Sequence, residues 1–179
     1  MLNIDIRELA TEDKDAFEKY VIACQKDNTK FGIFSRQRYD GFDFNSFEKH
    51  CLNLKNEANR DKQDKKSRQI SYFAFINDEI VGSIRCRLDI EKEELLQYGG
   101  HIGYDVPTYA RGKNVSEQLC LFAFEQYKKL GINNVLAVID EYNYASRHVI
   151  EKFNGRIEDW VYEPEDNAKV ARYWVNLVQ

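Results

Sequence analysis

The turn over residues 111–114, with the sequence Arg-Gly-Lys-Asn, is the segment whose residue types could most readily do chemistry. It joins a predicted strand over residues 100–106 to a predicted helix that ends near Leu130. The start of a helix attracts anions, because its first backbone N–H groups are free and the helix dipole is positive there. The two cations and the hydroxyl of Ser116 strengthen this attraction. The turn therefore predicts a phosphate or pyrophosphate site, and an ordinary turn before a capped helix is the alternative.

Two common phosphate-binding patterns are missing from this turn. It has neither the Gly-x-x-x-x-Gly-Lys-Ser/Thr loop of P-loop proteins nor the Gly-x-Gly-x-x-Gly fingerprint of dinucleotide-binding folds. Ser116 is predicted to be a first-turn residue that touches phosphate rather than a nucleophile, because no His–acid pair accompanies it.

The composition indicates one folded domain over residues 1–179. Hydrophobic residues make up 43% of the chain and aromatic residues 13%, which suits a sizeable core and not a disordered chain. The net charge of -4 disfavours a dedicated nucleic-acid binder, since such proteins usually carry a strongly basic surface. No apolar run approaches the roughly 20 residues of a membrane span, and the N-terminus does not resemble a signal peptide. We therefore expect no nucleic acid and no membrane as partners, and a cytoplasmic location.

The cysteines and histidines do not form a metal-binding pattern. No Cys-x-x-Cys pair occurs, and the spacing suits neither a zinc site nor a disulfide scaffold. The residues concerned are Cys24, Cys51, Cys86, Cys120, His50, His101 and His148. We expect reduced cysteines and no metal.

Hydrophobic periodicity predicts the elements that position the turn. Strands are expected over residues 2–8, 70–76, 79–90, 100–106, 135–139, 156–162 and 170–178. Helices are expected after Thr11, near 47–54, from 115 to 130 and over 144–153, with an irregular loop over 31–45. These elements predict an α/β (mixed α+β) domain with one central, mostly antiparallel mixed sheet of about seven strands and helices on both faces.

Two details of this pattern concern side-chain directions and chain reversals. Along the strand over 79–90, Ile84 and Cys86 face one way while Arg85 and Arg87 face the other. Residues 77–78, Asn-Asp, predict a two-residue turn that tolerates positive φ.

Two segments, in the correct order, resemble motifs of the GNAT superfamily of acyl-CoA-dependent N-acyltransferases. Residues 100–106 followed by 111–116 resemble its motif A, Gln/Arg-x-x-Gly-x-Gly/Ala, and residues 140–152 resemble its motif B, Asn-x-x-Ser followed by a helix and Glu-Lys. Residues 172–175 resemble the last strand of a bacterial subgroup of predicted acetyltransferases. The order of elements is similar to the family's fold over nearly the whole chain.

The resemblance implies acetyl-CoA as the cosubstrate and no metal. It implies cosubstrate contacts along the strand, the turn and the motif B helix, at Tyr104, Asp105, Val106, Arg111, Gly112, Lys113, Asn114, Val115, Ser116, Asn143 and Ser146. Two of these positions depart from the family pattern, since Asn114 stands where glycine is usual and Ser116 where glycine or alanine is usual.

The implied reaction is direct attack of a neutral amine on the thioester carbonyl, with no covalent enzyme intermediate. The backbone N–H near Val106 would hold the carbonyl oxygen, and Asn143 would bind the pantetheine arm or, as the plainer alternative, only cap its helix. Many family members have a general-acid Tyr where this chain has Ile150, so Tyr144, Tyr142 or water is expected to protonate the thiolate.

A general base and an acceptor are less well defined by the sequence. His101, Asp105 and Glu94 are candidate bases, and each also has a structural or solvated role as its alternative. The aromatic residues of 31–47 could line an amine pocket or belong to the core, and the core is favoured for most of them. Asn143, Tyr144 and His101 are the predicted catalytic residues, and the acceptor is a small-molecule or peptide amine. A CoA-binding module or sensor without efficient turnover is the alternative function. The sequence does not decide between a monomer and a homodimer.

Overall fold

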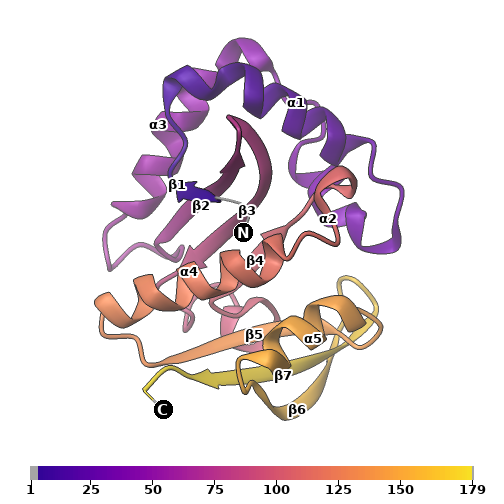
Figure 1. The fold of residues 1–179 in the computed structure, drawn as a ribbon. Coiled ribbons are helices and arrows are strands. Elements are labelled where there is room, and N and C mark those ends of the chain that lie inside the picture. Colours follow the sequence, from indigo (N-terminus) through magenta and orange to yellow (C-terminus); the bar gives the residue numbers. More distant parts are fainter. Residues whose placement is uncertain (1–3, 179) are drawn as a thin grey trace.

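Four of the seven strands described form one antiparallel sheet, in the order β1-β2-β3-β4 (Figure 1). The structure is a computed structural model that describes residues 4–178. Its strands are β1 Asp5–Arg7, β2 Gln69–Ile76, β3 Glu79–Arg87 and β4 Ile102–Asp105. Asn77 and Asp78 reverse the chain with φ of 49° and 61°, as their residue types predict. Leu2 and Asn3 of the expected first strand lie outside the described residues.

The other three strands form a second antiparallel sheet, in the order β5-β7-β6. They are β5 Asn134–Asp140, β6 Arg156–Glu163 and β7 Ala168–Asn176. The predicted mixed fold class is confirmed. Hydrogen bonding nevertheless divides the strands into two sheets, whereas the sequence predicts a single one, and the cause lies where β4 approaches β5.

β4 and β5 meet at one point and then separate. A single backbone bridge joins Gly100 to Ala137. The backbone N–H of His101 donates to the Leu136 carbonyl at 2.8 Å, and the Leu136 N–H donates to His101 Nδ1 at 2.9 Å. A side chain thus takes the place of a strand carbonyl, and beyond it β4 pairs only with β3. Gly100 has φ of 65°, and a Cβ there would lie 2.6 Å from the Leu136 carbonyl oxygen, so the close approach requires glycine.

Helices cover both faces of the first sheet. The helices α1 Lys14–Gln25 and α3 Phe47–Ala58 pack against β3 and β2. On the other face, α4 Val115–Lys129 packs against β3 and β4, and α5 Tyr144–Lys152 follows β5 (Figure 1). A further helix, α2 Ile33–Arg38, lies within the expected irregular loop, so that expectation is wrong for six residues.

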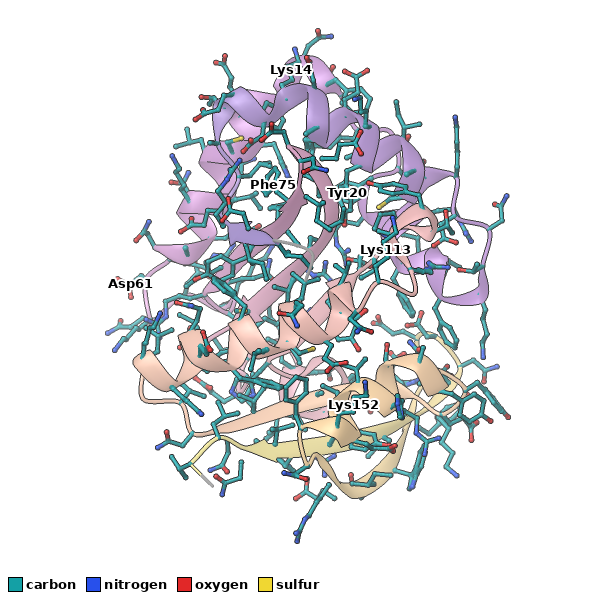
Figure 2. All side chains as sticks on the ribbon, viewed as in Figure 1. Lys14, Tyr20, Asp61, Phe75, Lys113 and Lys152 are labelled. Atoms are coloured by element: carbon teal, nitrogen blue, oxygen red, sulfur yellow. The ribbon has the colours of Figure 1, made fainter. Side chains whose placement is uncertain are left out.

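The alternation of side chains along β2 gives each face of this sheet its own core. Phe73 and Phe75 belong to an aromatic-rich cluster with α1 and α3, while Ala74 belongs to the cluster beneath α4. Figure 2 shows Tyr20 and Phe75 in the space between α1 and the strands. Burying these large side chains supplies the hydrophobic stabilisation that fixes α1 and α3 on the sheet.

Shorter helical turns connect the main elements. They are Thr11–Asp13, Lys30–Gly32, Phe44–Ser46 and Thr108–Ala110, together with a π-helical turn at Leu95–Gly99. Within residues 4–178, no helix combines the length and the apolar character that crossing a membrane requires.

His101 makes the stability of the fold depend on pH, because its Nδ1 must be unprotonated to accept the Leu136 N–H. Burial and the charge of Arg87 lower the pKa of His101 from 6.5 to about 4. Between these values the unfolded state binds more protons, so the free energy of unfolding should fall as pH falls through this window. The loss should reach up to roughly 3 kcal/mol, and denaturant titrations across the window would measure it.

The matched variant is His101→Asn, which keeps an acceptor at the position but does not titrate. Its free energy of unfolding should fall less than that of the wild type over the same pH range. The other titratable groups are present in both proteins, so they cancel in the comparison. Equal pH slopes would contradict this role of His101.

Candidate active site

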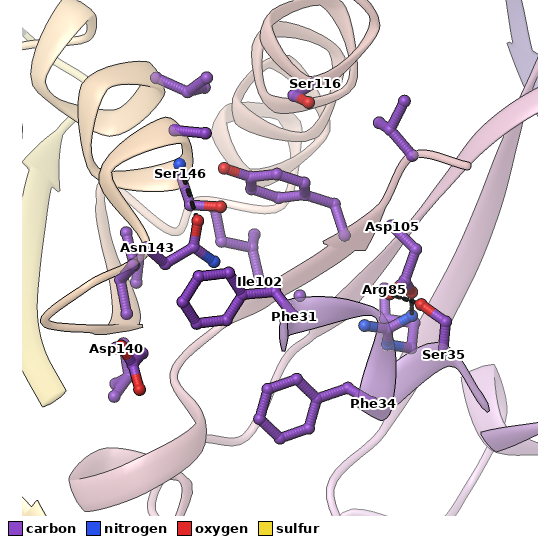
Figure 3. Close-up of a pocket in the computed structure, with 18 of the residues that line it drawn as sticks. Phe31, Phe34, Ser35, Arg85, Ile102, Asp105, Ser116, Asp140, Asn143 and Ser146 are labelled. Carbon is purple, nitrogen blue, oxygen red and sulfur yellow. Dashed lines mark hydrogen bonds and ion pairs between the residues drawn. The ribbon is translucent and has the colours of Figure 1, made fainter. Parts of the chain in front are cut away.

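A cavity of about 780 Å³ lies between β4, β5 and the first turns of α4 and α5. Figure 3 shows Asn143 and Ser146 on one side of it and Asp105 with Arg85 on the other. The structure brings together all the predicted cosubstrate-binding residues except Lys113, which is exposed and does not line the cavity. Those that line it are Tyr104, Asp105, Val106, Arg111, Gly112, Asn114, Val115, Ser116, Asn143 and Ser146.

The turn before α4 presents backbone donors to this cavity. Gly112 and Asn114 have φ of 76° and 59°, and the side chain of Asn114, at the N-cap position, forms no capping hydrogen bond to α4. Asn114 thus adopts the left-handed conformation that asparagine tolerates better than most residues. A Cβ at Gly112 would meet nothing within 4 Å, so the backbone is open there. This arrangement can hold an anion.

Arg111 is engaged with a buried carboxylate rather than free beside the turn. Its Nη2 donates to Oδ2 of Asp27, and its Nε donates to the Val106 carbonyl at 3.1 Å. Asp27 is only 4% exposed. Burial alone would raise the pKa of Asp27, but hydrogen bonds from Thr29 and the charge of Arg111 bring it below its ordinary value. Arg111 therefore fastens the segment after α1 to the end of β4.

Asn143 caps α5, because its side-chain oxygen accepts the Ser146 N–H at 3.2 Å. Its amide nitrogen donates to no other group among the residues described, and Asn143 lines the cavity. Asn143 therefore caps α5 with its side-chain oxygen, and its amide N–H groups remain able to donate to a ligand.

Tyr104 places a buried hydroxyl in the same cavity wall. Its phenol oxygen is shielded from solvent and has no hydrogen-bond partner among residues 4–178. Burial raises the pKa of Tyr104 well above its ordinary value, and the nearby Ser146 side chain lowers it slightly although the two groups do not meet in hydrogen-bond geometry. Tyr104 is therefore a protonated donor, and a buried donor without a partner requires an explanation, of which a role toward a ligand in this cavity is one.

Two of the three predicted catalytic side chains lie outside the cavity lining. Tyr144 is 67% exposed at the start of α5, with its ring near the Arg147 guanidinium. His101 is buried at the junction of β4 and β5, where its Nδ1 is occupied by the Leu136 N–H. Ile150, where the motif B resemblance leads us to expect Tyr, is fully buried in the core. This geometry favours structural roles for His101 and Ile150.

Asp105 joins three elements through its carboxylate. It accepts hydrogen bonds from Ser35 and Arg85, both at 2.6 Å, and it also pairs with Arg38. Burial would raise the pKa of Asp105, but the charges of Arg85 and Arg38 hold it far below its ordinary value. A carboxyl group with so low a pKa is a poor proton acceptor, so Asp105 is poorly suited to act as the general base. Glu94, the remaining candidate base, is exposed and does not line the cavity.

The aromatic residues after α1 divide between cavity and core. Phe31 and Phe34 line the cavity, and Figure 3 shows them between Asp140 on one side and Asp105 on the other. Tyr39, Phe42 and Phe44 pack in the aromatic-rich core, as the sequence predicts for most of this segment. Periodicity missed α2 because it is only six residues long, and with it the cavity residues Ser35 and Arg38.

No group of three or more His, Cys, Asp or Glu side chains is placed to hold a metal ion within residues 4–178. The four cysteines are all buried and unpaired. The donors that converge on the cavity are backbone N–H groups, an amide, a phenol and guanidinium groups, which suit an anionic or polar organic ligand.

Comparison with known proteins identifies a family. The sequence profile described as the Acetyltransferase (GNAT) family matches residues 35–155, which include both the turn before α4 and the start of α5. Among curated proteins, none matches the sequence.

Solved structures of low identity share the fold. An N-acetyltransferase from Staphylococcus aureus Mu50 is 21% identical, with 98% of this chain and 99% of that chain covered and a TM-score of 0.64. RimL, a ribosomal L7/L12 alpha-N-protein acetyltransferase in complex with coenzyme A, is 16% identical, with coverage of 98% and 95% and a TM-score of 0.71. The putative acetyltransferase yncA from Salmonella typhimurium, with acetyl-CoA, is 12% identical, with coverage of 99% and 95% and a TM-score of 0.63.

The ion pair between Arg111 and Asp27 is expected to contribute to the free energy of unfolding. Arg111→Ala leaves a buried carboxylate without its cation, so it should lower the free energy of unfolding by about 1–3 kcal/mol. Lys113→Ala, two residues away, removes an exposed cation and should change stability by less than about 0.5 kcal/mol. Denaturant unfolding of both variants tests the difference, and equal small effects would show that the ion pair contributes little.

Proposed function

This chain belongs to the GNAT acetyltransferase family, and from that premise we propose that it transfers an acetyl group from acetyl-CoA to a primary amine. The acceptor would be a small molecule or a peptide, and the amine would attack the thioester directly. One observation carries this proposal: the uncapped start of α4 and the free amide of Asn143 face the same cavity.

The residues of the cavity fit acetyl-CoA in their chemistry. The backbone N–H groups of residues 112–116 would hold the pyrophosphate, because they donate to no group within residues 4–178 and lie at the positive end of the α4 dipole. The Asn143 amide would donate to the pantetheine arm, and Ser146 would line its path. We assign no phosphate contact to Arg111, since its guanidinium is already bound to Asp27.

The reaction requires two proton movements beside the exchange of bonds. The amine nitrogen forms a bond to the acetyl carbon as the carbon–sulfur bond breaks, the nitrogen loses a proton, and the sulfur gains one. We propose that Tyr104 supplies the proton to sulfur, because it lines the cavity and its hydroxyl has no hydrogen-bond partner within residues 4–178. The phenolate left on Tyr104 would regain a proton from water. The proton from nitrogen would leave through water, since two arginines hold Asp105 as a very weak base.

A cytoplasmic location forms part of this proposal. The four buried, unpaired cysteines support it, because reduced thiols are typical of that compartment.

Release of free thiol from acetyl-CoA in the presence of a panel of amines tests the proposed transfer. Turnover with any primary amine, dependent on that amine, is the expected result. Thermal stability should also rise with acetyl-CoA, since a ligand that binds only the folded state stabilises it. A rise in stability with no thiol release from any amine would instead favour a CoA-binding module without turnover.

Tyr104→Phe tests the proposed proton donor. It removes one buried hydroxyl without changing the shape of the ring, and it should lower kcat by about 10²-fold. The affinity for acetyl-CoA, measured by calorimetry, should change little.

Tyr144→Phe is the matched control, because it makes the same chemical change on an exposed ring outside the cavity lining. Its kcat should stay near that of the wild type. A larger loss in Tyr144→Phe than in Tyr104→Phe would move the proton donor to Tyr144.

A further inference from the structure

Three arginines form one wall of the cavity. Arg38 comes from α2, and Arg85 and Arg87 come from β3. Arg85 and Arg87 project from the face of β3 opposite to Ile84 and Cys86, which pack in the core beneath α4. The cationic wall, defined as Arg38, Arg85 and Arg87, is therefore separate from the anion site at the start of α4.

Asp105 is the only carboxylate that pairs with the cationic wall within residues 4–178. Its Oδ2 accepts from Arg85 at 2.6 Å, and the same oxygen pairs with Arg38. One negative charge is thus shared by two guanidinium groups. The wall keeps a net positive charge even before Arg87 is counted.

Arg87 forms no ion pair with any residue that the structure describes. Its Nη1 donates to the carbonyls of Gly99 at 2.9 Å and Gly100 at 3.1 Å, and its other N–H groups have no acceptor in the described chain. Burial and the charge of Arg85 lower the pKa of Arg87 to about 10, so it remains a cation at neutral pH. Arg87 is half-buried and lines the cavity, so a ligand's negative charge there would offset the cost of its partial desolvation.

Gly103 gives the Arg85 guanidinium its position. It stands opposite Arg85 in the β3–β4 register, and a Cβ there would lie 2.9 Å from Arg85 Nη2. The Nε of Arg85 is buried and has no acceptor among residues 4–178. Arg85 thus adds an N–H group without an acceptor, its Nε–H, beside Arg87.

Acidic residues lie on the other side of the cavity. Figure 3 shows Asp140 across the cavity from Arg85, with Phe31 and Phe34 between them. Glu163 and Asp166, from the end of β6 and the turn after it, also line the cavity. Lys30 pairs with Asp140 at 3.6 Å, so Glu163 and Asp166 are the acidic groups on this side that could attract the cationic end of a ligand whose anionic end meets the cationic wall.

We propose that the acceptor is a small amine that also carries a carboxylate, an α-amino acid or a short peptide with a free C-terminus, and that Arg87 with Arg85 binds this carboxylate. The proposal rests on the proposed acetyltransferase activity, which it narrows to a class of acceptor. A planar guanidinium fork binds a carboxylate more strongly than a neutral amide, because the hydrogen bonds are charge-assisted.

The test compares the free acid and the primary amide of the same α-amino acids as acceptors, by thiol release from acetyl-CoA. The wild type should favour the acid in kcat/KM by about 10-fold or more. Arg87→Leu should reduce that preference by about 10-fold to 100-fold through the KM of the acid, with the KM of acetyl-CoA unchanged. Equal use of acid and amide by the wild type, or an unchanged preference in Arg87→Leu, would overturn the proposal.

Arg156→Leu is the matched control. Arg156 is exposed at the start of β6 and does not line the cavity, so this variant makes the same change of charge without touching the cationic wall. It should keep the wild-type preference. If Arg87→Leu does not fold, Arg87→Lys keeps the charge without the fork and should still raise the KM of the acid selectively.

Equilibrium binding separates this proposal from the proposed transfer. Calorimetry with N-acetylated α-amino acids and their amides needs no turnover. Binding of the acids to the wild type, weakened in Arg87→Leu and absent for the amides, would support the carboxylate site even if no amine released thiol. Equal binding of acids and amides, or none of either, would overturn it even if transfer to other amines were observed.

Discussion

The contact between His101 and Leu136 determines where the two sheets separate, and the candidate active site depends on that separation. Two hydrogen bonds, from the His101 N–H to a carbonyl and from the Leu136 N–H to the imidazole, hold β4 against β5 at one point. Past this point the strands pair with other neighbours, so their inner edges are free to line a cavity. Gly100 makes the approach sterically feasible, since any Cβ there would clash with β5.

Two ion pairs then attach the N-terminal helical region to this cavity. Asp27 binds Arg111, and Asp105 binds Arg38, across 84 and 67 residues of sequence respectively. Each pair includes a carboxylate that is buried, so losing the cation would leave a charge in a site of low polarity. These pairs keep α2 and the segment after α1 beside β4. They also neutralise charged side chains, such as Arg111, that the sequence alone would assign to binding a ligand.

Much of this organisation can be predicted from the sequence, because it rests on local patterns. Alternation predicts the strands and the opposite facing of Arg85 and Ile84, and the residue types of Asn114 and Asn77 predict positive φ. The turn and the motif B segment predict most of the residues that line the cavity. Long-range pairings leave no such local signal. Nothing near Arg111 indicates Asp27, and nothing near His101 indicates that its imidazole accepts a strand N–H. The short helix α2 has too few residues to show a period, so the cavity residues it contributes were missed.

Hydrogen–deuterium exchange with and without acetyl-CoA tests most directly whether the cavity between β4 and β5 is the cosubstrate site. Backbone N–H groups that hold a ligand exchange more slowly, because bound groups are not free to open to solvent. The structure predicts protection over residues 104–106, 112–117 and 143–146, with β1 and α3 unchanged as internal controls. Protection confined to other segments, or none at saturating acetyl-CoA, would contradict the assignment.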